Sequence, residues 1–110
     1  MADLGRVCVF CGANVGSRPE YTAAAEVLGV ALARREVRLV YGGGQVGLMG
    51  VVANSVLAVG GEVVGVLPES LATKELAHPT LTEMRVVGSM HERKTLMADL
   101  ADGLIALPGG

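Results

Sequence analysis

The sequence predicts an α/β fold in which helices cover both faces of a doubly wound parallel sheet. Short apolar segments alternate with helical patterns, and each segment is almost continuously hydrophobic, as strands buried on both faces are. The length agrees, because 110 residues suit one small domain with a single core. We therefore expect residues 1–110 to form one domain.

Five apolar segments are expected to be the strands. Alternation with helices predicts parallel pairing through right-handed crossovers, and we expect the strand order 3-2-1-4-5 in chain numbering. The segments are Val7–Phe10, Leu39–Tyr41, Val63–Leu67, Met84–Val87 and Leu104–Leu107.

Three helices are expected between these strands. The first begins at a capping box formed by Ser17 and Glu20 and continues through an apolar stripe. The second and third are expected to cover about residues 46–59 and 90–101. Residues 68–82 form a long connection without strong periodicity, and such a connection is more often functional than idle.

The composition excludes several classes of protein. Hydrophobic residues make up 51% of the chain and charged residues 18%, which rules out a disordered protein. With a net charge of −2 and only 3% aromatic residues, the chain lacks the positive charge and the aromatic stacking surface of nucleic-acid-binding proteins. Every apolar run is too short to span a membrane and no signal peptide is visible, so we expect no membrane association and a cytoplasmic location.

Cys8 and Cys11 have the spacing C-x-x-C, which occurs in redox and zinc sites. Three positions along a strand, however, point to opposite faces, and the sequence has no second cysteine pair or histidine cluster. We therefore expect two buried, reduced thiols and no metal site.

The segment Gly42–Gly50 follows the second expected strand and opens a helix. Glycines in this segment would let the backbone approach an anion such as phosphate or sulfate at the helix N-terminus. They are Gly42, Gly43, Gly44 and Gly47. A tight turn with close helix packing explains the same glycines equally well. The spacing G-x-G-x-x-G follows the second strand instead of the first, and a Walker lysine is absent, so we expect neither a dinucleotide nor a nucleoside triphosphate.

Two further glycine turns follow the first and fifth expected strands. They begin at Gly12 and at Pro108, the second containing Gly109 and Gly110. In a doubly wound sheet all three turns lie at the carboxyl ends of strands, where ligands bind.

The third helix begins with Ser89-Met-His-Glu-Arg-Lys94, in which Ser89 and Glu92 fit a capping box. On a helical wheel Arg93 and Lys94 flank the buried stripe, whereas His91 faces solvent. Positive charge near a helix N-terminus is unfavourable, which suggests that both cations face an anion. The alternative explanation for their position is that the aliphatic parts of both side chains cover apolar surface while the charged ends reach water.

These motifs, in this order, resemble the LOG (Lonely Guy) family, whose members are often mislabelled lysine decarboxylases. The matching segments are Cys11–Gly16, Gly42–Gly50, Ser89–Lys94 and Leu107–Gly110, so the resemblance extends over essentially the whole chain. It implies a Rossmann-like fold, a homodimer, and hydrolysis of the N-glycosidic bond of cytokinin riboside 5′-monophosphates to free base and ribose 5-phosphate, with AMP as a poorer substrate. It implies no metal and no organic cofactor.

Carried over residue by residue, the resemblance implies that Arg93 is catalytic and that Lys94 contacts the nucleoside 5′-monophosphate. Glu75 matches a substrate-binding acid, and Gly109 and Gly110 match the start of the phosphate and ribose loop. The family pattern continues Pro-Gly-Gly-x-Gly-Thr-x-Glu-Glu, whereas this sequence ends at the second glycine. We therefore expect the N-terminal part of a longer, here C-terminally truncated, family domain, with negligible turnover by these residues alone.

Two other function classes stay open. One is a non-catalytic module that binds a phosphorylated ligand, as in the related molybdenum-cofactor carrier proteins. The other is a subunit with a purely structural role. A longer reading frame with the Thr-x-Glu-Glu segment after Gly110 would favour the enzyme.

Overall fold

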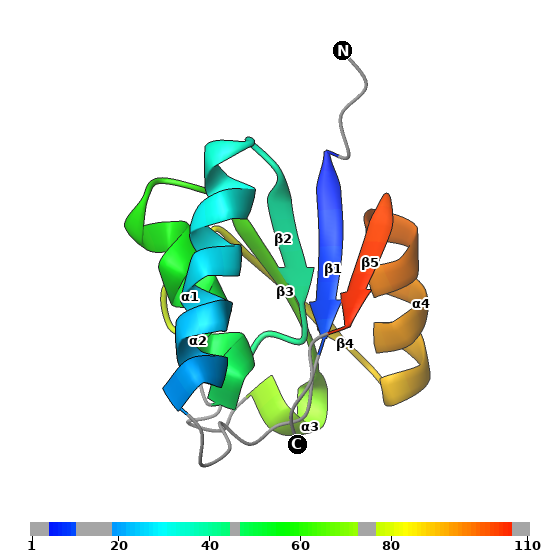
Figure 1. The fold of residues 1–110 in the computed structure, drawn as a ribbon. Coiled ribbons are helices and arrows are strands. Elements are labelled where there is room, and N and C mark those ends of the chain that lie inside the picture. Colours follow the sequence, from blue (N-terminus) through cyan, green and yellow to red (C-terminus); the bar gives the residue numbers. More distant parts are fainter. Residues whose placement is uncertain (1–4, 11–18, 45–46, 73–76, 107–110) are drawn as a thin grey trace.

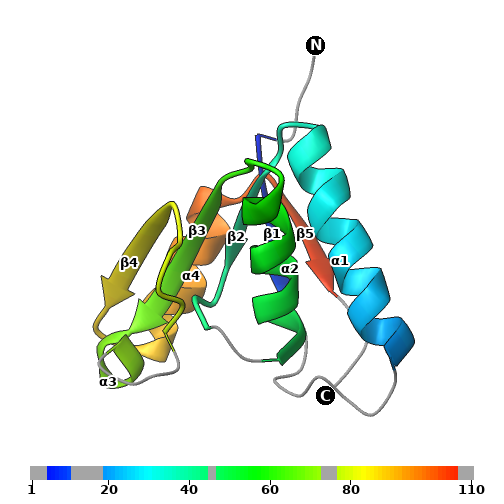
Figure 2. The same ribbon diagram turned by 90° about the vertical axis from the view of Figure 1, so that its left-hand side faces the viewer.

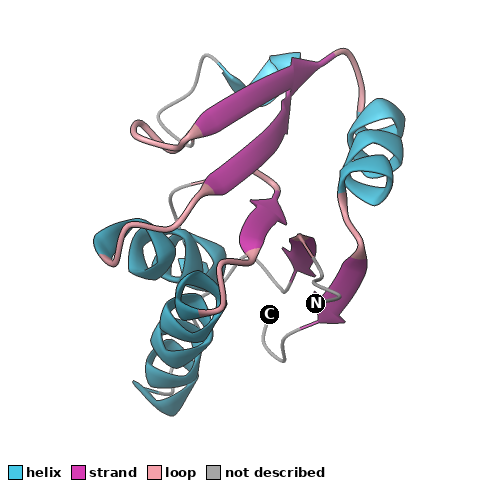
Figure 3. Cartoon of the chain, turned by 90° about the horizontal axis from the view of Figure 1, so that it is seen from above, coloured by secondary structure: helices cyan, strands magenta, loops and turns pink. Residues whose placement is uncertain are grey.

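The computed structural model describes residues 5–10, 19–44, 47–72 and 77–106 and shows an α/β fold with one parallel sheet (Figure 1). Helices α1 (Pro19–Arg34) and α2 (Gly47–Ala58) cover one face and α4 (Met90–Leu100) covers the other, as the view from above shows (Figure 3). A short helix, α3 (Glu69–Ala72), follows the third strand. The strands are β1 (Arg6–Phe10), β2 (Arg38–Tyr41), β3 (Val63–Pro68), β4 (Glu83–Val87) and β5 (Gly103–Ala106). The expected α/β class and parallel pairing are confirmed.

The strand order is β4-β3-β2-β1-β5, so the expected order 3-2-1-4-5 is wrong. β4 pairs with β3, with Val64 opposite Glu83, and forms the edge beyond β3 (Figure 2) instead of lying beside β1. β5 takes the place beside β1, with Val7 opposite Gly103. Alternation and crossover rules fix the direction of each strand but not the edge to which it is added. The reversal of strand order therefore lies between β1 and β5.

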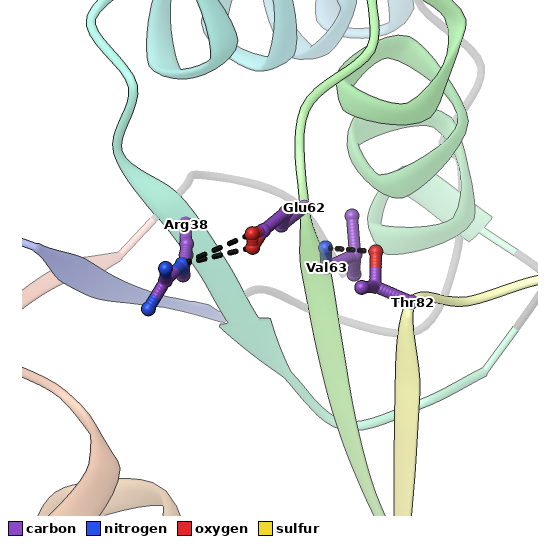
Figure 4. Close-up of polar contacts among 4 residues, drawn as sticks. All are labelled: Arg38, Glu62, Val63 and Thr82. Atoms are coloured by element: carbon purple, nitrogen blue, oxygen red, sulfur yellow. Dashed lines mark hydrogen bonds and ion pairs between the residues drawn. The ribbon is translucent and has the colours of Figure 1, made fainter.

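A hydrogen bond from the backbone to a side chain joins the start of β3 to the residue before β4. The amide of Val63, the first residue of β3, donates to Oγ1 of Thr82 at 2.9 Å, directly before β4 begins (Figure 4). Nearby, Nε of Arg38 lies 3.0 Å from a carboxylate oxygen of Glu62, and this pair is half exposed. The Thr82 bond holds the incoming chain at the amino end of β3, whereas the exposed pair adds little to stability.

Alternation along the strands divides the buried residues between the two faces of the sheet. One cluster lies beneath α1 and α2, the other beneath α4. The first contains Val7, Val9, Leu39, Tyr41 and Val63, with Ala25, Leu32, Leu48, Val52, Ala53 and Val56 from the helices. The second contains Cys8, Val40, Val64 and Val66, with Leu96, Met97 and Leu100 packed against it.

Cys8 is buried and unpaired, as the sequence predicts, and burial raises the pKa of its thiol. Cys11 lies outside the described residues. No helix within the described ranges is long and apolar enough to cross a membrane.

Candidate functional site: a glycine turn that receives Arg93

The turn Gly42–Gly44 follows β2 at the carboxyl edge of the sheet, and we call it the glycine turn. Gly43 has φ +82°, a conformation that a residue with a side chain adopts only with strain. The next described residue, Gly47, opens α2 with φ +74°. The sequence thus places both glycines correctly between a strand and a helix.

All three carbonyls of the glycine turn accept hydrogen bonds from distant parts of the fold. The Gly42 oxygen accepts from Nη2 of Arg93 at 2.5 Å, and the Gly43 oxygen accepts from the amide of His78 at 2.8 Å. The Gly44 oxygen accepts from the hydroxyl of Tyr41 at 2.6 Å. Tyr41 is fully buried, and burial raises the pKa of its phenol. The conformation of the turn is therefore set by α4, by the β3–β4 connection and by β2 together.

Arg93 reaches the turn from the first turn and a half of α4. Ser89 caps this helix, because its hydroxyl accepts from the amide of Glu92 at 3.1 Å. The Glu92 carboxylate accepts from the amide of Gly88, one residue before the cap. The expected cap is confirmed, and it fixes the start of α4 and with it the path of the Arg93 side chain.

The guanidinium of Arg93 joins α4 to the glycine turn and to β3. Besides its bond to Gly42, its Nε donates to the carbonyl of Val66 at 2.9 Å, and its Nη1 lies 3.7 Å from the sulfur of Met90. Burial lowers the pKa of Arg93, yet a guanidinium remains protonated in proteins. The ion pairs of the described residues join Arg38 to Glu62 and Arg85 to Glu83, so they leave the positive charge of Arg93 uncompensated.

Gly42 has a role that the sequence analysis did not anticipate. A Cβ atom on residue 42 would overlap with Nη2 of Arg93 and would lie 3.0 Å from its Cζ. The absence of a side chain at Gly42 therefore makes room for the guanidinium, whether or not a ligand also approaches there. No local pattern reveals such a role, because it depends on a residue 51 positions away.

A cavity of about 480 Å³ lies between α4 and the sheet, with Gly42, Arg93 and Lys94 in its lining. The rest of its described lining is apolar and includes Phe10 and Leu104, which are 48% and 66% exposed. Arg93 is half buried, whereas Lys94 is exposed at the border of the cavity. The two cations therefore line the same cavity, and that they face an anion there stays a prediction.

The structure thus brings three of the sequence-predicted residues together at one cavity. Gly43, Gly44 and Gly47 are not among its lining residues: the first two lie in the glycine turn and the third opens α2. His91 is exposed, as expected. The other expected site residues, Gly12, Glu75, Gly109 and Gly110, lie outside the described residues. Among the described residues, no three His, Cys, Asp or Glu side chains are grouped as a metal site.

Comparison with known proteins identifies the family. A family model described as "Possible lysine decarboxylase" matches residues 49–110, which is more than half of the chain. A cytokinin riboside 5′-monophosphate phosphoribohydrolase of Rhodococcoides fascians is 58% identical over 94% of this chain and 53% of its own length. One of Arabidopsis thaliana is 49% identical over 99% of this chain and 51% of its own length. The chain therefore spans about half the length of these curated relatives.

Solved structures share the fold at lower identity. A molybdenum cofactor binding protein of Rippkaea orientalis aligns with a TM-score of 0.82 at 21% identity, over 100% of this chain and 66% of its own. A molybdenum cofactor carrier protein of Chlamydomonas reinhardtii aligns with a TM-score of 0.81 at 22% identity, over 98% and 65%. These likenesses show a common Rossmann-type fold alone. By the match to the family model and by its relatives, the chain belongs to the LOG family, the family whose model is described as "Possible lysine decarboxylase".

Proposed function

We propose that this chain supplies the Arg93-bearing part of an enzyme that hydrolyses the N-glycosidic bond of cytokinin riboside 5′-monophosphates, and AMP less well. The observation that carries the proposal is the guanidinium of Arg93, held at the carboxyl edge of the sheet by two carbonyls and paired with no carboxylate of the described residues. The names of relatives that are 58% and 50% identical support the same reaction. We further propose that residues 1–110 are the N-terminal part of a longer family domain, since these relatives are about twice as long.

The reaction explains why a fixed cation is useful here. Water attacks C1′ of the ribose, the C1′–N bond breaks, and its electron pair leaves with the base, which takes up a proton. The transition state has oxocarbenium character at the sugar, so precise placement of the nucleotide lowers the barrier. Two carbonyls hold the Arg93 guanidinium, and its remaining N–H groups are donors for an anionic group of the nucleotide.

The other site residues receive roles in the same proposal. Lys94, at the border of the cavity, contacts the nucleotide, and the glycine turn holds the phosphate near the start of α2. Phosphate or sulfate should compete for this position. Glu75 and the glycines Gly12, Gly109 and Gly110 complete the site as the family resemblance implies. No metal or organic cofactor takes part.

We also propose that the protein acts as a cytoplasmic homodimer. Phe10 and Leu104 support self-association, because they expose apolar side chains on the face of the sheet that α4 leaves partly open.

The test is an assay of free isopentenyladenine released from isopentenyladenosine 5′-monophosphate. Residues 1–110 are compared with a longer version in which the second half of the Rhodococcoides fascians relative follows them. We expect turnover by the longer version only. In it, Arg93→Ala and Arg93→Lys should each lower kcat/KM by at least about a hundredfold, whereas Arg85→Ala, at an exposed arginine of β4, should leave kcat/KM unchanged.

Two results would count against the proposal. Full turnover by the Arg93 variants would remove Arg93 from the mechanism. Tight binding of a phosphorylated ligand without turnover, by a longer version that is folded, would favour the carrier class instead.

A further inference from the structure

His78 is a buried histidine in the connection between β3 and β4. Its exposed fraction is 7%, whereas His91, the only other histidine of the sequence, is exposed on α4. A buried imidazole has to satisfy both ring nitrogens to offset the loss of water. The hydrogen-bond partners of these two nitrogens therefore show which protonation state and tautomer of the ring fit the fold.

Both ring nitrogens of His78 have partners, and these partners require one neutral tautomer. Nδ1 accepts a hydrogen bond from the amide of Thr80 at 3.2 Å, so it carries no proton. Nε2 lies 2.6 Å from Oδ1 of Asn54 and therefore carries the proton that it donates. A second proton on the ring would face the Thr80 amide proton and would break that bond. The contacts thus hold only while the ring is neutral.

The backbone of the same residue holds the glycine turn. The amide of His78 donates to the Gly43 carbonyl at 2.8 Å, and the neighbouring Ala77 forms an antiparallel bridge with Gly44. The Gly43 carbonyl adjoins the Gly42 carbonyl on which Arg93 docks. A shift of His78 would therefore move the acceptor that positions Arg93.

The imidazole itself is a poor candidate for acid–base chemistry, because both nitrogens are occupied and the ring is almost fully covered. It is also no metal ligand, since no group of three ligating side chains forms among the described residues. The contacts instead connect three elements: α2 through Asn54, the β3–β4 connection through Thr80, and the glycine turn through the backbone amide.

We propose that His78 is a positioning residue: its neutral ring fastens the β3–β4 connection to α2 and to the glycine turn, so that the Gly42 carbonyl holds Arg93, and protonation of the ring releases this arrangement. This inference rests on the proposed function only for the role of Arg93. The arrangement itself is a property of the fold and is measured without turnover.

Among the described residues, burial governs the protonation of His78. Helix α2, strand β3 and residues 77–82 carry no other ionisable side chain. On β4 the two charged residues, Glu83 and Arg85, pair with each other, Glu69 on α3 is exposed, and Tyr41 meets the turn through its neutral hydroxyl. Burial lowers the pKa of His78 from its ordinary value of 6.5. The arrangement is therefore complete above pH 6.5 and is lost as the pH falls through the lowered pKa.

The experiment follows the pH titration of the ¹⁵N-labelled chain by NMR. The signals are the His78 imidazole, the His78 amide and the Arg93 Nε–H group. We expect all three to change with one common midpoint below pH 6.5. The hydrogen-exchange protection of the His78 amide should fall at least about tenfold through that midpoint. His91→Asn, which alters the exposed histidine, should leave the midpoint unchanged and assigns the two imidazole signals.

Two variants separate positioning from mere stability. Asn54→Asp, at an exposed residue of α2, places a carboxylate next to Nε2 and should raise the common midpoint by about one pH unit. His78→Asn keeps an acceptor for the Thr80 amide but cannot titrate, so the change in the Arg93 signal should disappear. In the longer version, kcat/KM should fall on the acid side with the same midpoint and should shift with Asn54→Asp.

The proposal is overturned if the Arg93 signal changes with a midpoint that Asn54→Asp does not move, or if the same change persists in His78→Asn. If His78→Asn does not fold, the Asn54→Asp titration decides alone. If the longer version shows no turnover, the proposed function fails, whereas the NMR titration still decides the role of His78.

Discussion

Nη2 of Arg93 lies 2.5 Å from the carbonyl oxygen of Gly42 and fills the space that a side chain at position 42 would need. This contact joins α4 to the glycine turn at the edge of the sheet. It matters for α4 because none of the residues of this helix is fully buried. The same guanidinium serves the stability of the fold and presents charge to the cavity. The two roles can be separated by changing the glycine instead of the arginine.

Gly42→Ala should displace Arg93 while leaving its charge in place. The added methyl group overlaps with Nη2, and we expect the free energy of unfolding to fall by about 1–3 kcal/mol. In the longer version, kcat/KM should fall at least about tenfold. Gly88→Ala is the matched control, because its methyl group would meet only the end of the Glu92 side chain at 3.2 Å. Equal stability of both variants in urea unfolding would contradict the prediction.

Thr82→Val should test the contact that places β4 beside β3. The change removes the acceptor of the buried Val63 amide but keeps the side-chain shape, and we expect a loss of about 1–3 kcal/mol in unfolding free energy. Arg38→Ala, which removes the neighbouring exposed ion pair, should cost about 0–1 kcal/mol. Urea unfolding of both variants measures the difference. A larger loss in Arg38→Ala than in Thr82→Val would show that the ion pair is the stronger anchor.

Cys8 should react slowly with alkylating reagents. The residue is 3% exposed and burial raises the pKa of its thiol, so little thiolate forms at neutral pH. In a Cys11→Ser variant, iodoacetamide at pH 8 should react at least about tenfold more slowly with the folded than with the urea-unfolded chain. Because the raised pKa favours the thiol in the folded state, stability should be full below the ordinary pKa of 9.0 and should fall as the pH rises above it. Comparable rates in the folded and unfolded chains would refute the burial of Cys8.

Leu104→Lys should weaken self-association. The side chain is 66% exposed on β5, and a lysine there disfavours contact with a second copy. Sedimentation velocity at increasing concentration should show a larger monomer fraction than in the unchanged chain. Val27→Lys, at a valine that is 69% exposed on the opposite face in α1, is the control and should have no effect. The reverse result would place the contact surface on α1.

The strands could be predicted closely because continuous β-branched runs leave few alternatives. The observed β3, Val63–Pro68, extends the expected segment by one residue, and the cap at Ser89 forms as the sequence indicates. The strand order could not be predicted, because it depends on contacts such as that of Thr82 with Val63, between residues 19 positions apart. Helix α3, with four residues, is too short to show a periodic pattern.

For the candidate site, too, local features could be predicted from the sequence and long-range contacts could not. The helical wheel predicted Arg93 and Lys94 as site residues, because their position beside the buried stripe depends only on the local sequence. The partners of Arg93 were not predicted, since the carbonyls of Gly42 and Val66 come from the glycine turn and from β3, far away along the chain. His78 escaped notice because nothing in its neighbourhood along the chain indicates burial. Its environment comes from Asn54 and from the glycine turn.

The position of β1 has a consequence for biosynthesis. β1 lies between β2 and β5, and the amide of Arg6 donates to the Asp102 carboxylate across a separation of 96 residues. At the usual speed of a ribosome, β1 therefore waits roughly 5–20 s with one side open before β5 is made. The contacts of α1 and α2 with β2 and β3 are available much earlier. On the ribosome β1 can pair with β2 as soon as β2 is made, whereas the other side of β1, which faces β5, is among the last parts of the sheet to be closed.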